Sequence, residues 1–171
     1  IDVRSKRGAG TTVWVYLPRS AREAPAKDDA EILVSGRGRI LFMDDEAPIR
    51  ECAAEMMRHL GYAVVCAQDG QEAVDDFRKA WDAKEPFDAV ILDLTVRAGM
   101  GGREAVRRLR EIDPQVKAIV SSGYSNDPVL ADFHRHGFAR HITKPYTAEN
   151  LSRILADVLG SGWAPAPISA A

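Results

Sequence analysis

Side chains that could handle a phosphoryl group and a magnesium ion follow apolar runs of this 171-residue chain. Each stands where a run such as 39–43 or 87–92 ends. They are the acidic pair Asp44 and Asp45, the carboxylate Asp93, the hydroxyls Ser121 and Ser122, and the ammonium of Lys144. Carboxylates, a hydroxyl and a lysine at the carboxyl ends of strands are what a phosphoryl-binding magnesium site requires.

Alternating apolar and helical patterns predict the elements that position these side chains. Five short apolar runs predict strands near residues 39–43, 62–66, 87–92, 116–120 and 138–143. Apolar residues at helical spacing follow each run, with Pro48 suited to a first helical turn and Gly61 to a helix end. Such an alternation predicts an α/β fold, a doubly wound five-stranded parallel sheet with helices on both faces. In these folds ligands bind at the carboxyl ends of the strands.

Four motifs resemble those of response-regulator receiver domains. They are Met43-Asp44-Asp45-Glu46, Asp93-Leu94, Ser122-Gly123 and Lys144-Pro145, in the order in which that family has them. Together they are far more specific than any one alone. The resemblance spans residues 38–160 and implies the flavodoxin-like strand order 2-1-3-4-5. It also implies that Asp93 accepts a phosphoryl group from phosphohistidine with the help of Mg²⁺.

The carboxylates are the predicted magnesium ligands. Asp45 and Asp93 can each supply an oxygen, and Asp44 would act mainly through a metal-bound water. The resemblance adds the backbone carbonyl of Thr95, two residues past the acceptor. A plainer interpretation of the acidic pair is that it caps the following helix. Adjacent acids after a buried strand repel each other without a cation, which favours the metal site.

The resemblance gives the two remaining polar groups catalytic roles. Lys144 would pair with Asp93 and then with a phosphoryl oxygen, which suits a mobile point charge. Ser122 would donate its hydroxyl to the phosphoryl group, because the small Gly123 follows it as in the family; Ser121 is the alternative. The Lys144-Pro145 bond fits the peptide that receivers often make cis. A plainer interpretation of Lys144 is an exposed lysine before a turn.

Two positions depart from the family pattern. The switch position, three residues before the lysine, holds His141 instead of Tyr or Phe. An imidazole can rotate like an aromatic ring and also titrates near neutrality, although a plain surface histidine is the simpler interpretation. The loop 94–102 resembles a long variant found in hybrid kinases. Arg97 stands where that variant often has proline, and we expect the arginine to loosen the loop.

The residues before the receiver form a different pattern. The run Thr12 to Leu17 reads as an isolated strand, and the preceding Gly8-Ala9-Gly10-Thr11 resembles the last glycine box of a histidine-kinase ATP-binding domain. We therefore predict a kinase remnant at 1–18, a linker at 19–37, the receiver at 38–160 and a flexible tail at 161–171. This order is that of a hybrid sensor histidine kinase, although the segment itself lacks a complete kinase site.

Composition constrains the partners. The net charge of −2 gives no basic excess, so we expect no nucleic-acid binding, and no apolar stretch is long enough to cross a bilayer. We expect a cytoplasmic protein whose partner is a histidine kinase core or a histidine phosphotransfer domain, with homodimer formation left open. The competing interpretation is a receiver-like interaction module that works without phosphorylation; the full set of acids, hydroxyl and lysine argues against it.

Overall fold

The computed structural model describes residues 1–18, 33–123 and 128–160. The chain divides into two compact units, Ile1–Ala30 and Glu31–Ala171. The predicted tail 161–171 and the predicted linker up to residue 32 lie outside the described residues. None of the helices in the described ranges is long and apolar enough to cross a membrane.

The first unit contains a β-hairpin. Strand β1 (Asp2–Lys6) pairs antiparallel with β2 (Gly10–Trp14), and positive φ angles occur at Gly8 in the turn, 80°, and at Gly10 at the start of β2, 90°. The prediction of an isolated strand from Thr12 to Leu17 was therefore wrong in its bounds and in its lack of a partner. The glycines make the tight turn at no steric cost, and this lets the polar segment before them pair back on β2.

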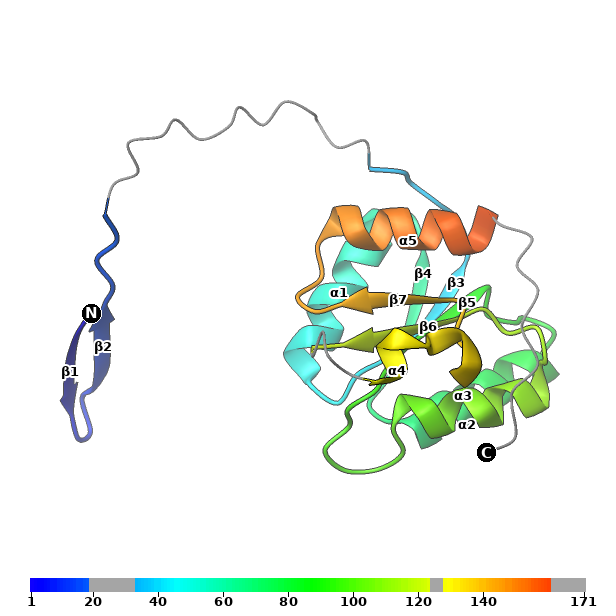
Figure 1. Cartoon of the computed structure of the whole chain (residues 1–171), viewed down its shortest axis with the longest axis horizontal. Helices are drawn as coiled ribbons and strands as arrows, with labels where there is room; N and C mark the ends of the chain where they lie inside the picture. The colour runs from blue at the N-terminus through cyan, green and yellow to red at the C-terminus, as the bar shows by residue number, and fades with distance from the viewer. Residues whose placement is uncertain (19–32, 124–127, 161–171) are drawn as a thin grey trace. The chain divides into compact units, whose positions relative to one another are not determined.

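Five parallel strands form the sheet of the second unit (Figure 1). They are β3 (Arg39–Met43), β4 (Ala63–Ala67), β5 (Ala89–Asp93), β6 (Ala118–Ser122) and β7 (Arg140–Thr143). Their order is β4-β3-β5-β6-β7, which confirms the predicted order 2-1-3-4-5 when the strands of this unit are counted alone. In this register Asp93 lies opposite Ser121 and Ser122 opposite Thr143, so the polar residues share one edge of the sheet.

Helices connect the strands. They are α1 (Ala47–His59), α2 (Gly70–Asp82), α3 (Gly102–Ile112), α4 (Pro128–Ala131), the 3₁₀ helix η1 (Phe133–His136) and α5 (Ala148–Gly160). The predicted helix end at Gly61 is confirmed, because Gly61 has a φ of 99° just past α1. At the start of α5 the Thr147 hydroxyl accepts a hydrogen bond from the Asn150 amide at 3.2 Å. Between β6 and β7 the chain forms the short helices α4 and η1, and Gly137 ends η1 in the left-handed region.

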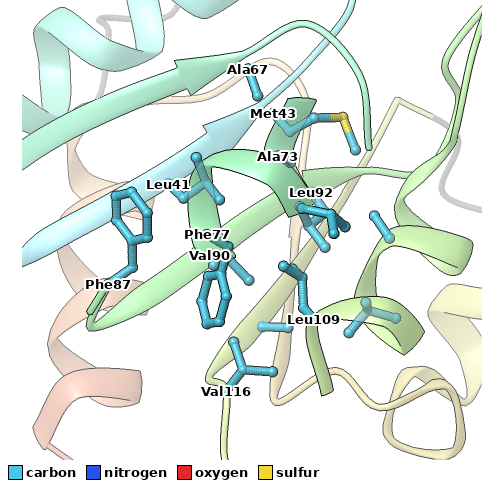
Figure 2. Close-up of a cluster of buried hydrophobic side chains, with 14 of the residues drawn as sticks. Leu41, Met43, Ala67, Ala73, Phe77, Phe87, Val90, Leu92, Leu109 and Val116 are labelled. Atoms are coloured by element: carbon cyan, nitrogen blue, oxygen red, sulfur yellow. The ribbon is translucent and has the colours of Figure 1, made fainter. Parts of the chain in front are cut away.

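Strand residues alternate between two apolar layers. Leu41, Val90 and Val120 face a cluster built with α2 and α3, as Figure 2 shows for Leu41 and Val90 beside Phe77 and Leu109. The neighbouring positions, among them Ile40, Ile91 and Ile119, face a second cluster built with α1 and α5. Both faces of the sheet are thus covered, which explains why the strands are apolar at successive positions.

A short segment before β3 packs against the end of this unit. The Val34 amide donates a hydrogen bond to Ser152 Oγ at 2.7 Å, and Ser152 Oγ donates to the Val34 carbonyl at 3.0 Å. The Gly36 amide donates to the Leu60 carbonyl at 2.9 Å. Ser152 on α5 is only 2% exposed. The last residues of the predicted linker are therefore held on α1 and α5.

Candidate functional site

The carboxyl end of β3 delivers a buried carboxylate. Asp44 is fully buried, and its Oδ1 accepts a hydrogen bond from the Glu46 amide at 3.0 Å. The Arg50 guanidinium donates to the Asp44 carbonyl at 2.6 Å. Residue Glu46 is the N-cap of α1, and no side chain caps that helix. The interpretation of the aspartates as helix caps is therefore wrong.

Lys144 joins the ends of β3 and β5. Its Nζ lies 2.6 Å from Asp44 Oδ2 and donates a hydrogen bond to Asp93 Oδ2 at 2.8 Å. The lysine side chain is only 14% exposed and Asp93 is 3% exposed, so the interpretation of Lys144 as an exposed lysine is also wrong. The Lys144-Pro145 peptide is cis, as predicted. The lysine head group thus lies between two carboxylates that stand far apart in the sequence.

Burial and ion pairing act in opposite directions on this pair. Burial raises the pKa of Asp93, the hydrogen bond and charge of Lys144 lower it, the charge of Asp44 raises it further, and the net direction is upward. Burial alone would lower the pKa of Lys144, but its bonds to Asp44 and Asp93 outweigh that effect and raise it. The lysine therefore remains an ammonium at neutral pH.

Carboxylate oxygens converge beside the lysine. Asp44, Asp45 and Glu46 place one oxygen each within 4.8 Å of one another. Asp44 Oδ2 is buried, and beyond its ion pair with Lys144 at 2.6 Å it has no other partner among the described residues. A buried acceptor with spare capacity and a set of hard oxygen donors fit Mg²⁺. Asp93 is connected to these acids by its hydrogen bond from Lys144. The backbone amide of Thr95, whose carbonyl is an expected ligand, donates a long hydrogen bond of 3.4 Å to Asp93 Oδ1.

The two serines at the end of β6 have different surroundings. The Ser121 hydroxyl is engaged with the Tyr146 phenol at 2.5 Å, and the Tyr146 ring packs edge-on against Phe42. Burial raises the pKa of the Tyr146 phenol, so it stays protonated and can bond Ser121. Ser122 is fully buried, and its carbonyl accepts the Lys144 amide at 3.0 Å. The backbone of Ser122 therefore fixes the start of the loop that carries the lysine.

Three contacts around the site escaped sequence reasoning. They are the Arg50 bond to Asp44, the Tyr146 bond to Ser121, and a bond from the Arg97 amide to Asp45. Only Arg50 has a local signal, because it lies one turn into the helix that follows the acidic pair. The predicted switch residue, His141, is exposed, and its ring centroid lies 5.0 Å from that of Phe133.

The fold and this set of polar groups define a phosphoryl-signalling receiver, and the family comparison agrees. The profile of the response regulator receiver domain matches residues 40–156. The chain belongs to this family, and it is a receiver domain of two-component systems.

Several relatives bear this out. The sensor kinase CckA of Brucella abortus is 28% identical over 166 residues, which cover 91% of this chain and 17% of CckA. The response regulator receiver protein Anae109_2439 of Anaeromyxobacter is 36% identical over 107 residues, 63% of this chain and 42% of that protein. The chain thus spans less than half the length of these relatives. The response regulator TrrA of Thermotoga maritima, solved in complex with Mg²⁺-BeF, superposes with a TM-score of 0.62 at 28% identity, covering 71% of this chain and 98% of that one.

Proposed function

We propose that this receiver accepts a phosphoryl group on Asp93 and that Asp44, Asp45, Asp93 and the Thr95 carbonyl hold Mg²⁺ for that reaction. The observation that carries the proposal is the Lys144 ammonium set 2.6 Å from Asp44 and 2.8 Å from Asp93. Phosphoryl transfer depends on positioning and on positive charge beside the transferred group, and this contact sets the Asp93 carboxylate against the Lys144 ammonium. The TrrA structure, a complex with Mg²⁺-BeF at 28% sequence identity, supports Mg²⁺ as the cation.

In the proposed reaction an oxygen of Asp93 attacks the phosphorus of phosphohistidine. The P–N bond breaks and the imidazole leaves with the electron pair. Lys144 moves its contact from the carboxylate to a phosphoryl oxygen, and Ser122 donates its hydroxyl to another. When bound, Mg²⁺ supplies further neutralisation of the charge on the phosphoryl oxygens. The protein contributes mostly position and electrostatics, because the donor already carries an activated bond.

We also propose that the chain is part of a hybrid sensor histidine kinase, with a kinase core or phosphotransfer domain as donor. The match to CckA extends over 166 residues, so it must include residues before the receiver as well as the receiver itself. In this proposal the hairpin β1-β2, with its glycine turn 8–10, is the edge of the kinase ATP-binding domain.

Labelling with acetyl phosphate tests the acceptor. The chain is incubated with Mg²⁺ and acetyl phosphate and its intact mass is measured. We expect one phosphoryl adduct in the wild type, none in Asp93→Asn, and none after chelation of the metal. The matched control is Asp82→Asn, which neutralises an exposed aspartate at the end of α2 and should label normally. Undiminished labelling of Asp93→Asn would refute the assignment.

A binding measurement tests the metal ligands separately from the chemistry. Calorimetry should show that Asp45→Ala weakens Mg²⁺ binding sharply, because one of the two direct carboxylate ligands is lost. Asp82→Asn should bind as the wild type does. Equal Mg²⁺ affinity in the wild type and Asp45→Ala would contradict the proposed ligand set even if labelling at Asp93 is confirmed.

A further inference from the structure

Arg97, in the loop between β5 and α3, contacts two of the three residues of the acidic group Asp44, Asp45 and Glu46. The Arg97 amide donates a hydrogen bond to Asp45 Oδ2 at 3.1 Å. The Arg97 guanidinium lies 3.7 Å from Glu46 Oε2, and its side chain is 78% exposed. Asp44, the third member, is paired instead with Lys144. The loop after β5 is therefore tied across the site to the loop after β3.

The two contacts depend on different properties of residue 97. The first needs a backbone N–H, which every residue except proline has. The second needs a positive charge. Arginine provides both. We had expected Arg97 to loosen this loop, and instead it makes two specific contacts. Residue 97 does not have a positive φ, because Lys84 is the one non-glycine residue in the described ranges that does. A proline at position 97 would therefore not be placed in the left-handed region.

Both contacts draw on the negative charge that a divalent cation would use. A carboxylate oxygen that accepts the Arg97 amide has one acceptor direction fewer for a metal or its water. A guanidinium beside Glu46 repels an incoming cation, although screening by solvent weakens this effect at an exposed site. Arg97 and Mg²⁺ therefore compete for the same group of acids.

We infer that Arg97 lowers the Mg²⁺ affinity of this receiver by occupying Asp45 and Glu46 when the metal is absent. This inference rests on the proposed function of the site. Residue 97 then sets the Mg²⁺ concentration at which the site fills. The guanidinium and the amide act in the same direction, and they can be separated by substitution.

Calorimetric titration with MgCl₂ of the full chain and four variants tests the inference. Arg97→Ala keeps the amide and loses the charge, so its dissociation constant should fall about two- to fivefold. Arg97→Pro loses both contacts, so its dissociation constant should fall about tenfold. Arg97→Lys should stay close to the wild type. Arg135→Ala is the matched control, because Arg135 has a side chain exposed to the same extent and an ion pair with Asp132 at 2.9 Å outside the acidic group.

Two further measurements exclude indirect effects. The difference between Arg97→Ala and the wild type should shrink at high ionic strength, as an exposed charge requires. Amide hydrogen exchange at Arg97 should be slow without metal and faster at saturating Mg²⁺, because the bond to Asp45 is given up. Thermal unfolding of each variant confirms that the fold is intact.

The outcomes separate this inference from the proposed function. A wild type that binds Mg²⁺, with Arg97→Ala and Arg97→Pro binding equally or more weakly, would overturn the role of Arg97 and leave the site standing. A wild type that binds no Mg²⁺ would overturn both. The expected order of affinity is Arg97→Pro above Arg97→Ala above the wild type and Arg135→Ala.

Discussion

The Lys144 ammonium donates a hydrogen bond to Asp93 Oδ2 at 2.8 Å, between residues 51 positions apart in the sequence. Asp93 ends β5 and Lys144 follows β7, and these strands are separated by β6 in the sheet. The lysine therefore reaches across the end of β6 to meet the carboxylate. This relationship determines the expected behaviour of several variants.

Removal of the lysine should separate metal binding from phosphoryl transfer. Lys144→Ala leaves Asp44 and Asp93 without their shared cation, so Mg²⁺ should bind at least as tightly as in the wild type. Labelling by acetyl phosphate should slow about tenfold or more, because a charge that stabilises the transferring group is lost. Calorimetry and the rate of mass gain measure the two effects. Labelling of both Lys144→Ala and Ser122→Ala at the wild-type rate would contradict the proposed roles of these two residues.

Neutralising Asp93 should stabilise the metal-free protein at neutral pH. Burial raises the pKa of Asp93, so the folded state binds this proton more tightly than the unfolded state does. The resulting stability is present below the ordinary pKa of about 4 and is lost as the pH rises through the higher folded pKa. Asp93→Asn avoids this loss because its amide stays neutral.

Urea unfolding of the wild type and Asp93→Asn without Mg²⁺, at a series of pH values, measures the difference. We expect the variant to be the more stable at pH 7 and the difference to vanish below about pH 4. A variant that is less stable than the wild type at pH 7 would show that the Lys144 bond outweighs the burial of the carboxylate.

A single methyl group added at Gly102 should disturb the backbone of Asp93. A Cβ added at Gly102 would lie 2.6 Å from the Asp93 carbonyl oxygen and 3.1 Å from Leu92 Cβ. The backbone cannot rotate away as a side chain could, so Gly102→Ala should cost about 1–3 kcal/mol in the free energy of unfolding. Gly123→Ala, where an added Cβ meets nothing within 4 Å, is the control. Equal urea midpoints for the two variants would contradict this packing.

The segment before β3 should contribute to the stability of the receiver. Ser152→Ala removes both hydrogen bonds to Val34, which should cost about 1–2 kcal/mol and speed amide exchange at Val34. Ser35→Ala, at an exposed position in the same segment, should have little effect. If Ser152→Ala exchanges at Val34 as the wild type does, the segment is not held by α5.

The hairpin should bind no ATP by itself. Gly8, Gly10 and Thr11 would supply one edge of a nucleotide site, and few contacts cannot offset the entropy lost when a ligand is immobilised. Calorimetry should detect no ATP binding, and labelling of Asp93 should persist after deletion of residues 1–18. Saturable micromolar ATP binding that this deletion abolishes would favour a working kinase domain.

The sequence by itself determined the sheet and the carboxyl-end site. Strands β3, β4, β5 and β6 are mainly apolar runs with a polar residue at the end or directly after it, and both features are local in the chain. The places of Asp44, Asp45 and Asp93 at strand ends could be predicted because motif and strand end coincide, and the resemblance implied the cis peptide before Pro145. The burial of Lys144 between two carboxylates follows from the strand order, which the resemblance implied.

Tertiary structure decided the contacts that have no local pattern. β1 alternates charged and small residues and has no apolar face, so its pairing with β2 depends on the glycine turn. The Ser121 hydroxyl is committed to Tyr146 because β6 and the loop after β7 meet in space. Arg97 meets Asp45, 52 residues earlier, because the loops after β5 and β3 adjoin at the sheet edge. Hydrogen bonds and charges act over a few ångströms in space, and only the folded chain brings such distant residues that close.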